Sequence, residues 1–240
     1  MSEAQHGVTG LVLMHGAGLG GWIWRDVVPS LSAPAIAADF PARAAAADVR
    51  SRLTFDDYVA HLEAQVREFD VRRIVLVAHS IAGVLAPRLV RALGVRVVGL
   101  VAVAAVIPTG GGSFLSALPL ARRVPMMALL RLGTRPPDGV IRKGQCNDLD
   151  AKTADEVVAR FAPESRALFT ARSGVELPTL PSLYIHTTAD AELGLSLQRR
   201  MAATLGAAET AEIEAGHLPM LSRPAEVAGI VNRFTAQLGH

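Results

Sequence analysis

Aliphatic runs of strand length recur along the chain and alternate with segments of helical periodicity. The strands that we expect span residues 10–15, 35–39, 73–79, 97–107, 182–187 and 210–213, and the helices span 22–31, 55–69, 81–93, 195–205 and 224–238. Most of the strands are almost continuously aliphatic, which is typical of strands buried on both faces. Because β-α repeats of this kind build parallel sheets, the pattern predicts an α/β fold.

One long interval, residues 108–180, contains no expected strand. It opens with Pro108-Thr109-Gly110-Gly111-Gly112 and includes a helical pattern at 150–161. Unstructured loops of such length are uncommon in a domain. We expect residues 1–107 and 181–240 to form one core, and residues 108–180, called the insert below, to form a helical cap. The cap would lie over a pocket at the carboxyl ends of the strands, where α/β proteins bind ligands. A simple packing layer is the alternative.

Composition narrows the possible classes of protein. Hydrophobic residues make up 50% and charged residues 19% of the chain, values that exclude intrinsic disorder. The net charge of +2 and the aromatic content of 5% do not favour nucleic-acid binding. The longest apolar run, 97–107, is shorter than the roughly 20 residues of a membrane-spanning helix. We expect a monomer or homodimer that acts on a small molecule without a metal or cofactor.

Two further features concern the compartment. Met1–His6 has no basic or apolar segment typical of a secretory signal, so a cytoplasmic location is expected. Cys146, the single cysteine, cannot form an internal disulfide, which fits a reducing compartment. We interpret it as a buried, inert thiol, with a reactive thiol facing the pocket as the alternative.

Ser80 carries the strongest functional signal. The segment Ala78-His79-Ser80-Ile81-Ala82-Gly83 joins an expected strand directly to an expected helix. A serine on such a sharp turn exposes its hydroxyl, and it needs small neighbours because the two backbones nearly touch. Ala78 and Ala82 stand here where glycine is usual. We interpret Ser80 as a nucleophile, with a helix-capping serine as the alternative.

A nucleophilic serine needs a base and a group that orients the base. His217 follows the last expected strand, and Asp190 follows the strand before it, so both should lie at the edge of the sheet where Ser80 turns. Glu192 is the competing acid. In the alternative interpretations His217 is an exposed surface histidine and Asp190 caps the next helix.

The first expected strand runs into a glycine-rich loop, Gly16-Ala17-Gly18-Leu19-Gly20-Gly21. We expect the backbone N–H groups of Ala17 and Ile81 to form an oxyanion hole, because Ile81 begins a helix and the loop can turn a donor toward the serine.

The same loop fits a rival motif. Gly16, Gly18 and Gly21, with Asp39 after the next strand, match the spacing of a dinucleotide-binding fingerprint. A short-chain dehydrogenase would also need a lysine four residues after a tyrosine, and neither Tyr58 nor Tyr184 has one. The cofactor hypothesis also gives the serine, aspartate and histidine no common purpose.

With His15-Gly16-Ala17-Gly18, the serine turn, and then Asp190 and His217 in this order, the sequence resembles the α/β-hydrolase superfamily over nearly its whole length. The glycine loop running into Trp22-Ile23-Trp24 resembles the small methylesterase and hydroxynitrile-lyase group and its bacterial relatives. Residues 146–150 resemble a stretch in the caps of bacterial members. The resemblance implies a six-stranded, mostly parallel sheet flanked by helices, with a helical cap inserted after the fourth strand.

The resemblance also separates related activities. Epoxide hydrolases and haloalkane dehalogenases of this fold have aspartate at the position of Ser80. Hydroxynitrile lyases have threonine where Gly16 stands and lysine where Leu218 stands.

A serine hydrolase that forms an acyl-enzyme on Ser80 is therefore expected, acting on an ester or thioester of a small to medium, largely apolar substrate. Five residues are expected to contact this substrate: Gly16, Phe114, Met126, Met127 and Leu218. Acyl transfer, cyclisation, elimination or other proton-transfer chemistry, or ligand binding without catalysis, is the alternative.

Overall fold

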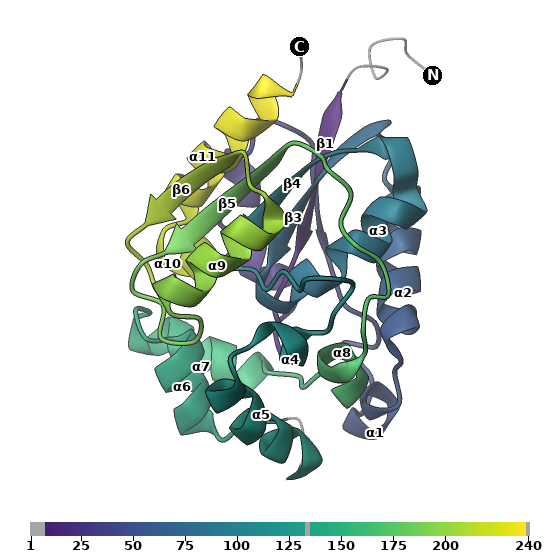
Figure 1. Ribbon diagram of the computed structural model, residues 1–240. Helices are drawn as coiled ribbons and strands as arrows, with labels where there is room; N and C mark the ends of the chain where they lie inside the picture. The colour runs from purple at the N-terminus through teal and green to yellow at the C-terminus, as the bar shows by residue number, and fades with distance from the viewer. Residues whose placement is uncertain (1–7, 133–134, 239–240) are drawn as a thin grey trace.

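The computed structural model describes residues 8–132 and 135–238 and builds them around one twisted sheet (Figure 1). Met1–His6, from which the cytoplasmic location is expected, lies outside the described residues. The strand order is β2-β1-β3-β4-β5-β6, and all neighbouring strands pair in parallel. The predicted six-stranded sheet is therefore confirmed. Its strands are β1 (Thr9–Met14), β2 (Ala35–Ala38), β3 (Arg73–His79), β4 (Val97–Val103), β5 (Ser182–Thr187) and β6 (Glu209–Ile213).

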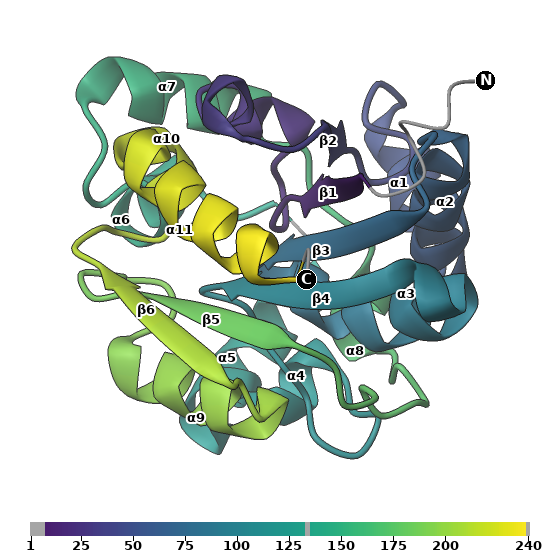
Figure 2. The same ribbon diagram turned by 90° about the horizontal axis from the view of Figure 1, so that it is seen from above.

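Helices cover both faces of the sheet (Figure 2). Strand side chains on one face of the sheet, such as Val12 and Leu76, pack against α2 (Phe55–Glu68), α3 (Ala86–Leu93) and α9 (Leu195–Leu205). Strand side chains on the other face, such as Leu13 and Val77, pack against α11 (Pro224–Gln237) and the 3₁₀ helix η2 (Gly21–Trp24). Burial on both faces explains why the strands are aliphatic without alternation.

Local sequence signals set several helix ends. Thr54 and Asp57 form a reciprocal capping box at the start of α2, which contributes roughly 1 kcal/mol to stability. Gly206, with φ of +64°, ends α9 in the left-handed conformation that glycine adopts readily. Short elements occupy connections elsewhere: α1 (Ala47–Ser51), η5 (Gly94–Arg96) and α10 (Pro219–Ser222).

Three predicted segments differ from the structure. The helix expected at 22–31 is wrong: the chain forms η2 and η3 (Val28–Ser30), because Pro29 has no N–H for a continuing α-helix. The helix expected at 81–93 starts as a 3₁₀ turn, η4 (Ser80–Val84), before α3. The strand expected at 97–107 ends at Val103, since Ala104 turns out of the sheet with φ of +42°.

The insert is helical and lies at the carboxyl ends of the strands (Figure 1). The helix expected at 150–161 corresponds to α7 (Ala151–Arg160), and Asp150 caps it by accepting a hydrogen bond from Thr153 N at 3.0 Å. Among the residues described, no helix has both the length and the apolar character needed to cross a membrane. The helices of the insert are α4 (Phe114–Ala117), α5 (Leu120–Leu132), α6 (Asp138–Gln145), α7 (Ala151–Arg160) and α8 (Arg166–Thr170).

Candidate active site

Ser80 occupies the turn between β3 and η4. Its φ is +54°, in the left-handed region, which costs a non-glycine residue about 1–3 kcal/mol. The neighbouring backbone fixes this turn, because Val106 N donates a hydrogen bond to Ser80 O at 3.0 Å. Gly83 also lies so close to the carbonyl oxygen of Val106 that a Cβ at that position would clash with it. The chain thus holds the Ser80 hydroxyl at the carboxyl end of the central strand.

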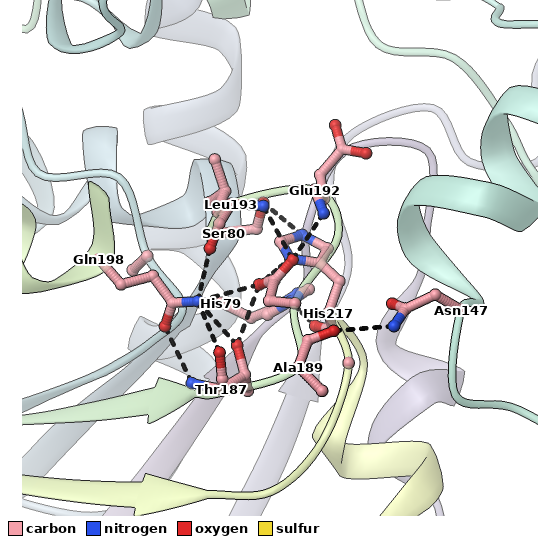
Figure 3. Close-up of polar contacts among 12 residues, drawn as sticks. His79, Ser80, Asn147, Thr187, Ala189, Glu192, Leu193, Gln198 and His217 are labelled. Atoms are coloured by element: carbon pink, nitrogen blue, oxygen red, sulfur yellow. Dashed lines mark hydrogen bonds and ion pairs between the residues drawn. The ribbon is translucent and has the colours of Figure 1, made fainter. Parts of the chain in front are cut away.

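His217, from the loop after β6, lies beside Ser80 (Figure 3). Asp190, from the loop after β5, contacts the far side of the His217 ring. His217 Nε2 lies 3.1 Å from Ser80 Oγ, and His217 Nδ1 lies 2.9 Å from Asp190 Oδ2. All three residues are buried. The structure therefore joins side chains from three distant parts of the sequence in one hydrogen-bonded chain.

The electrostatics of this row of hydrogen-bonded side chains favour an ion pair between Asp190 and His217. Burial alone lowers the pKa of His217, but the charge of Asp190 and its hydrogen bond outweigh burial and raise this pKa above its usual value. Burial alone raises the pKa of Asp190, but His217 and the hydrogen bonds to the carboxylate hold it below its usual value. The carboxylate is thus suited to stabilise a positive charge on the imidazole.

The Asp190 carboxylate is fixed by four further donors. Thr187 Oγ1 and Gln198 Nε2 donate to Oδ2 at 2.9 and 3.2 Å. The backbone N–H groups of Glu192 and Leu193 both donate to Oδ1 at 2.8 Å. Glu192, the competing acid, thus contributes a backbone donor to Asp190. Gln198 was not among the residues expected from the sequence, although a lone amide on the buried face of a helix is a usable signal.

Two buried histidines support the surrounding backbone. His79 Nε2 donates to His217 O at 2.9 Å, and burial holds the pKa of His79 well below its usual value. His15 Nδ1 donates to Gly16 O at 2.8 Å and its Nε2 accepts from Phe40 N at 3.0 Å. Burial lowers the pKa of His15 to about 3, so both rings are neutral near pH 7.

Ala17 and Ile81, the expected oxyanion-hole residues, line the same cavity as Ser80 and His217. Ile81 lies in the first turn of η4, where backbone N–H groups lack intrahelical acceptors. Gly16 lies against His79 and Ser80, so closely that a Cβ would crowd both side chains. The glycine loop and the serine turn therefore converge at the serine hydroxyl.

A buried carboxylate from the insert anchors the glycine loop. Glu164 accepts hydrogen bonds from Gly18 N at 3.2 Å, Tyr58 Oη at 3.0 Å and Arg43 Nη2 at 2.7 Å. Arg43 also donates to Leu19 O at 2.6 Å. Gly18 has φ of +80° and leaves no space for a Cβ beside the Phe161 ring. The conformation of the loop thus depends on residues at the end of the insert.

A cavity of about 130 Å³ lies between the insert and the serine turn. Of the expected substrate contacts, Phe114 and Met126 line it. Met127 packs against the main core, and Leu218 is fully buried in the cluster on the other face of the sheet. Gln145 and Glu192 line the cavity and were not expected. The rest of the lining is mainly apolar, including Leu129, Leu130, Val140, Ile141, Phe161, Phe169 and Leu193.

Comparison with known families shows where the chain belongs. Residues 11–230 match the alpha/beta hydrolase family. The chain belongs to this family. No curated protein sequence matches the chain significantly.

Solved structures share the fold of this alpha/beta hydrolase across nearly the whole chain. An extracellular alpha/beta-hydrolase from a Paenibacillus species has a TM-score of 0.81 at 16% identity, covering 94% of this chain and 98% of its own. A pyrethroid hydrolase from Sphingobium faniae JZ-2 has a TM-score of 0.78 at 22% identity, covering 95% and 98%. The methylesterase MES16 from Arabidopsis has a TM-score of 0.78 at 16% identity, covering 96% and 100%.

Two residues of the spacing that resembles a dinucleotide fingerprint have a structural role. In this alpha/beta hydrolase Asp39 Oδ1 accepts a hydrogen bond from Gly21 N at 2.7 Å. Gly21 packs against the carbonyl of Ala37 too closely for a Cβ. Both residues therefore serve the packing of the loop against β2.

Cys146 is buried, and burial raises the pKa of its thiol to about 11, which keeps the thiol protonated at neutral pH. Within the described part of the chain, no group of three or more His, Cys, Asp and Glu side chains is arranged to hold a metal ion.

Proposed function

We propose that this alpha/beta hydrolase cleaves esters or thioesters of small to medium, largely apolar substrates through an acyl-enzyme on Ser80. The observation that carries this proposal is the hydrogen-bonded chain from Asp190 through His217 to Ser80 Oγ, with contacts of 2.9 and 3.1 Å. Ser80, at the end of these hydrogen-bonded side chains, lines a cavity whose walls are mainly apolar. Neither a packed core histidine nor a helix-capping serine requires this geometry.

The mechanism follows from the hydrogen bonds. Ser80 Oγ attacks the carbonyl carbon while His217 Nε2 accepts the hydroxyl proton, and Asp190 stabilises the resulting imidazolium. The N–H groups of Ala17 and Ile81 stabilise the oxyanion, each contributing about 10²–10³ in rate. His217 then gives its proton to the leaving alcohol or thiol. Water, deprotonated by His217, attacks the acyl-enzyme and releases the acid.

The size of the cavity bears on the part of the substrate that lies next to Ser80. Cavities of roughly 150 Å³ lined by apolar side chains can hold benzene. The cavity of about 130 Å³ beside Ser80 therefore accommodates a short acyl chain or a single ring. We expect hydrolysis of p-nitrophenyl esters to be fastest for short acyl chains and to decline as the chain exceeds the length of the cavity.

Labelling with a fluorophosphonate tests the nucleophile directly. The wild-type protein should be labelled, and Ser80→Ala should lose labelling while keeping its thermal transition. Ser196→Ala, which removes an exposed serine in α9, is the matched control and should label normally. Labelling of Ser80→Ala at the wild-type rate would show that another group reacts.

Product analysis separates hydrolysis from its alternatives. Ester turnover that depends on Ser80 and releases the free acid supports the proposal. Labelling without release of acid would favour acyl transfer, and the absence of labelling would favour proton-transfer chemistry or ligand binding. A cytoplasmic location and a monomeric or homodimeric state complete the proposal; fractionation and sedimentation measurements test them.

A further inference from the structure

A short segment of the insert, residues 145–148, contacts three loops of the candidate active site. This bridging segment comprises the last residue of α6 and the start of the connection to α7. Gln145 Nε2 lies 3.5 Å from Ala17 O, Asn147 Nδ2 donates to Ala189 O at 2.8 Å, and Asp148 Oδ2 accepts from Gly216 N at 2.6 Å. Ala17, Ala189 and Gly216 belong to the glycine loop, the aspartate loop and the histidine loop, respectively.

The contact between Asp148 and the histidine loop is unusually close. A Cβ at position 216 would clash with the side-chain oxygens of both Asn147 and Asp148. Glycine therefore allows the loop to approach the bridging segment next to His217 without displacing these side chains. The second carboxylate oxygen, Asp148 Oδ1, is buried and has no hydrogen-bond partner among the described residues.

Asn147 restrains the neighbouring loop. Its amide donates to the carbonyl oxygen of Ala189, the residue directly before Asp190 (Figure 3). The backbone of the two loops is also joined directly, because Ala189 N donates to Ala215 O at 3.0 Å. The bridging segment thus holds a pair of loops that already contact each other and that carry the acid and the base.

We propose that Asn147 and Asp148 are positioning residues that fix the Asp190 and His217 loops relative to Ser80, and that the Asp148 carboxylate, bound to the backbone N–H next to His217, also acts on the imidazole through its charge. This inference rests on the proposed function. It assigns the insert a role in the chemistry as well as in the shape of the cavity.

The charges around His217 set the direction of the effect. Asp190, Glu192 and Asp148 all raise the pKa of His217, and Asp190 contributes most among these three. His79, packed with a ring-centroid distance of 4.8 Å from His217, is neutral near pH 7. Removing the charge of Asp148 therefore lowers the pKa of His217 and leaves the Asp190 contact in place.

The pH dependence of fluorophosphonate labelling tests this role without knowledge of the substrate. The labelling rate should rise with pH as His217 becomes neutral. Asp148→Asn keeps an oxygen that can accept from Gly216 N but removes the charge, so the midpoint of the rise should move to lower pH. Asp148→Ala also removes the acceptor and should lower the plateau rate about tenfold or more.

Two further variants separate charge from position. Asn147→Ala should lower the plateau rate without moving the midpoint, because the lost group is uncharged. Asp150→Asn is the matched control: it removes a carboxylate two residues from Asp148, and asparagine caps α7 as well as aspartate does. This control should label like the wild-type protein.

Each outcome has a defined meaning. A midpoint for Asp148→Asn that stays in place or moves up overturns the proposed adjustment of His217. Wild-type plateau rates in Asp148→Ala and Asn147→Ala overturn the positioning role. A wild-type protein that the probe does not label contradicts the proposed function itself, so the two failures can be told apart.

Discussion

Replacement of Asp190 by asparagine tests how the carboxylate acts on His217. Oδ1 accepts hydrogen bonds from two backbone N–H groups, those of Glu192 and Leu193, both at 2.8 Å. These two backbone donors cannot reverse, whereas the Thr187 hydroxyl and the His217 ring, which both contact Oδ2, can each become acceptors. We therefore expect an asparagine to place its carbonyl oxygen at the Oδ1 position and its NH₂ group at the Oδ2 position. The structure thus favours this orientation of the new amide.

This orientation forces the wrong tautomer. The amide donates to His217 Nδ1, so the ring proton moves to Nε2, which then donates toward Ser80 Oγ and cannot accept its proton. Such a change lowers turnover by about 10⁴-fold. At about 1.36 kcal/mol for each tenfold change, the transition state loses roughly 5.5 kcal/mol.

The assay compares Ser80 labelling and p-nitrophenyl ester hydrolysis in Asp190→Asn and in Asp70→Asn. Asp70 is exposed, and its substitution controls for the loss of one negative charge. Circular dichroism and thermal unfolding establish that both variants are folded. If Asp190→Asn keeps more than about a tenth of wild-type activity, the tautomer reasoning is refuted.

Three other predictions follow from the same contacts. Because the folded pKa of His217 is raised and the base must be neutral, kcat/KM should rise with pH through a midpoint above 6.5, and a midpoint below 6.5 would contradict the ion pair. Glu164→Ala leaves buried donors without their acceptor and should lower the free energy of unfolding by about 3 kcal/mol in urea titrations. The control Glu156→Ala removes a partly exposed carboxylate that pairs with Arg25 and Arg160 at the surface, and it should cost less than about 1 kcal/mol. Gly16→Ala should lower the rate at which Ser80 is labelled, because the added Cβ displaces the Ser80 side chain. An unchanged rate would show that the glycine loop shifts instead and leaves Ser80 in place.

The parallel sheet and the meeting of its strands' carboxyl ends were predictable from the sequence, whereas the order of the strands was not predicted. Parallel strands place the residues that follow them at one edge, so Ser80, Asp190 and His217 were expected together before any contact was known. The structure brings them within hydrogen-bond distance, and their catalytic roles stay predictions. The family assignment agrees with the resemblance seen in the sequence.

The end of the fourth strand was predicted wrongly because hydrophobic residues indicate burial but do not indicate whether a residue pairs with a neighbouring strand. Val106 and Ile107 are as buried as a strand residue, yet they lie beyond Ala104, where the chain has left the sheet to pack beside Ser80. The contacts of the bridging segment could not be predicted from the sequence either. Its contact with Gly216 joins residues 68 positions apart, and no local pattern specifies which loops an inserted helix pair will touch.

The backbone of Ser80 has a consequence for engineering. Glycine adopts positive φ readily, so Ser80→Gly would relieve about 1 kcal/mol of strain that the native side chain imposes on the turn. A library screened for heat resistance alone would enrich this substitution and lose the reactive hydroxyl. Screens for robust variants of this chain therefore need a selection on turnover at every round.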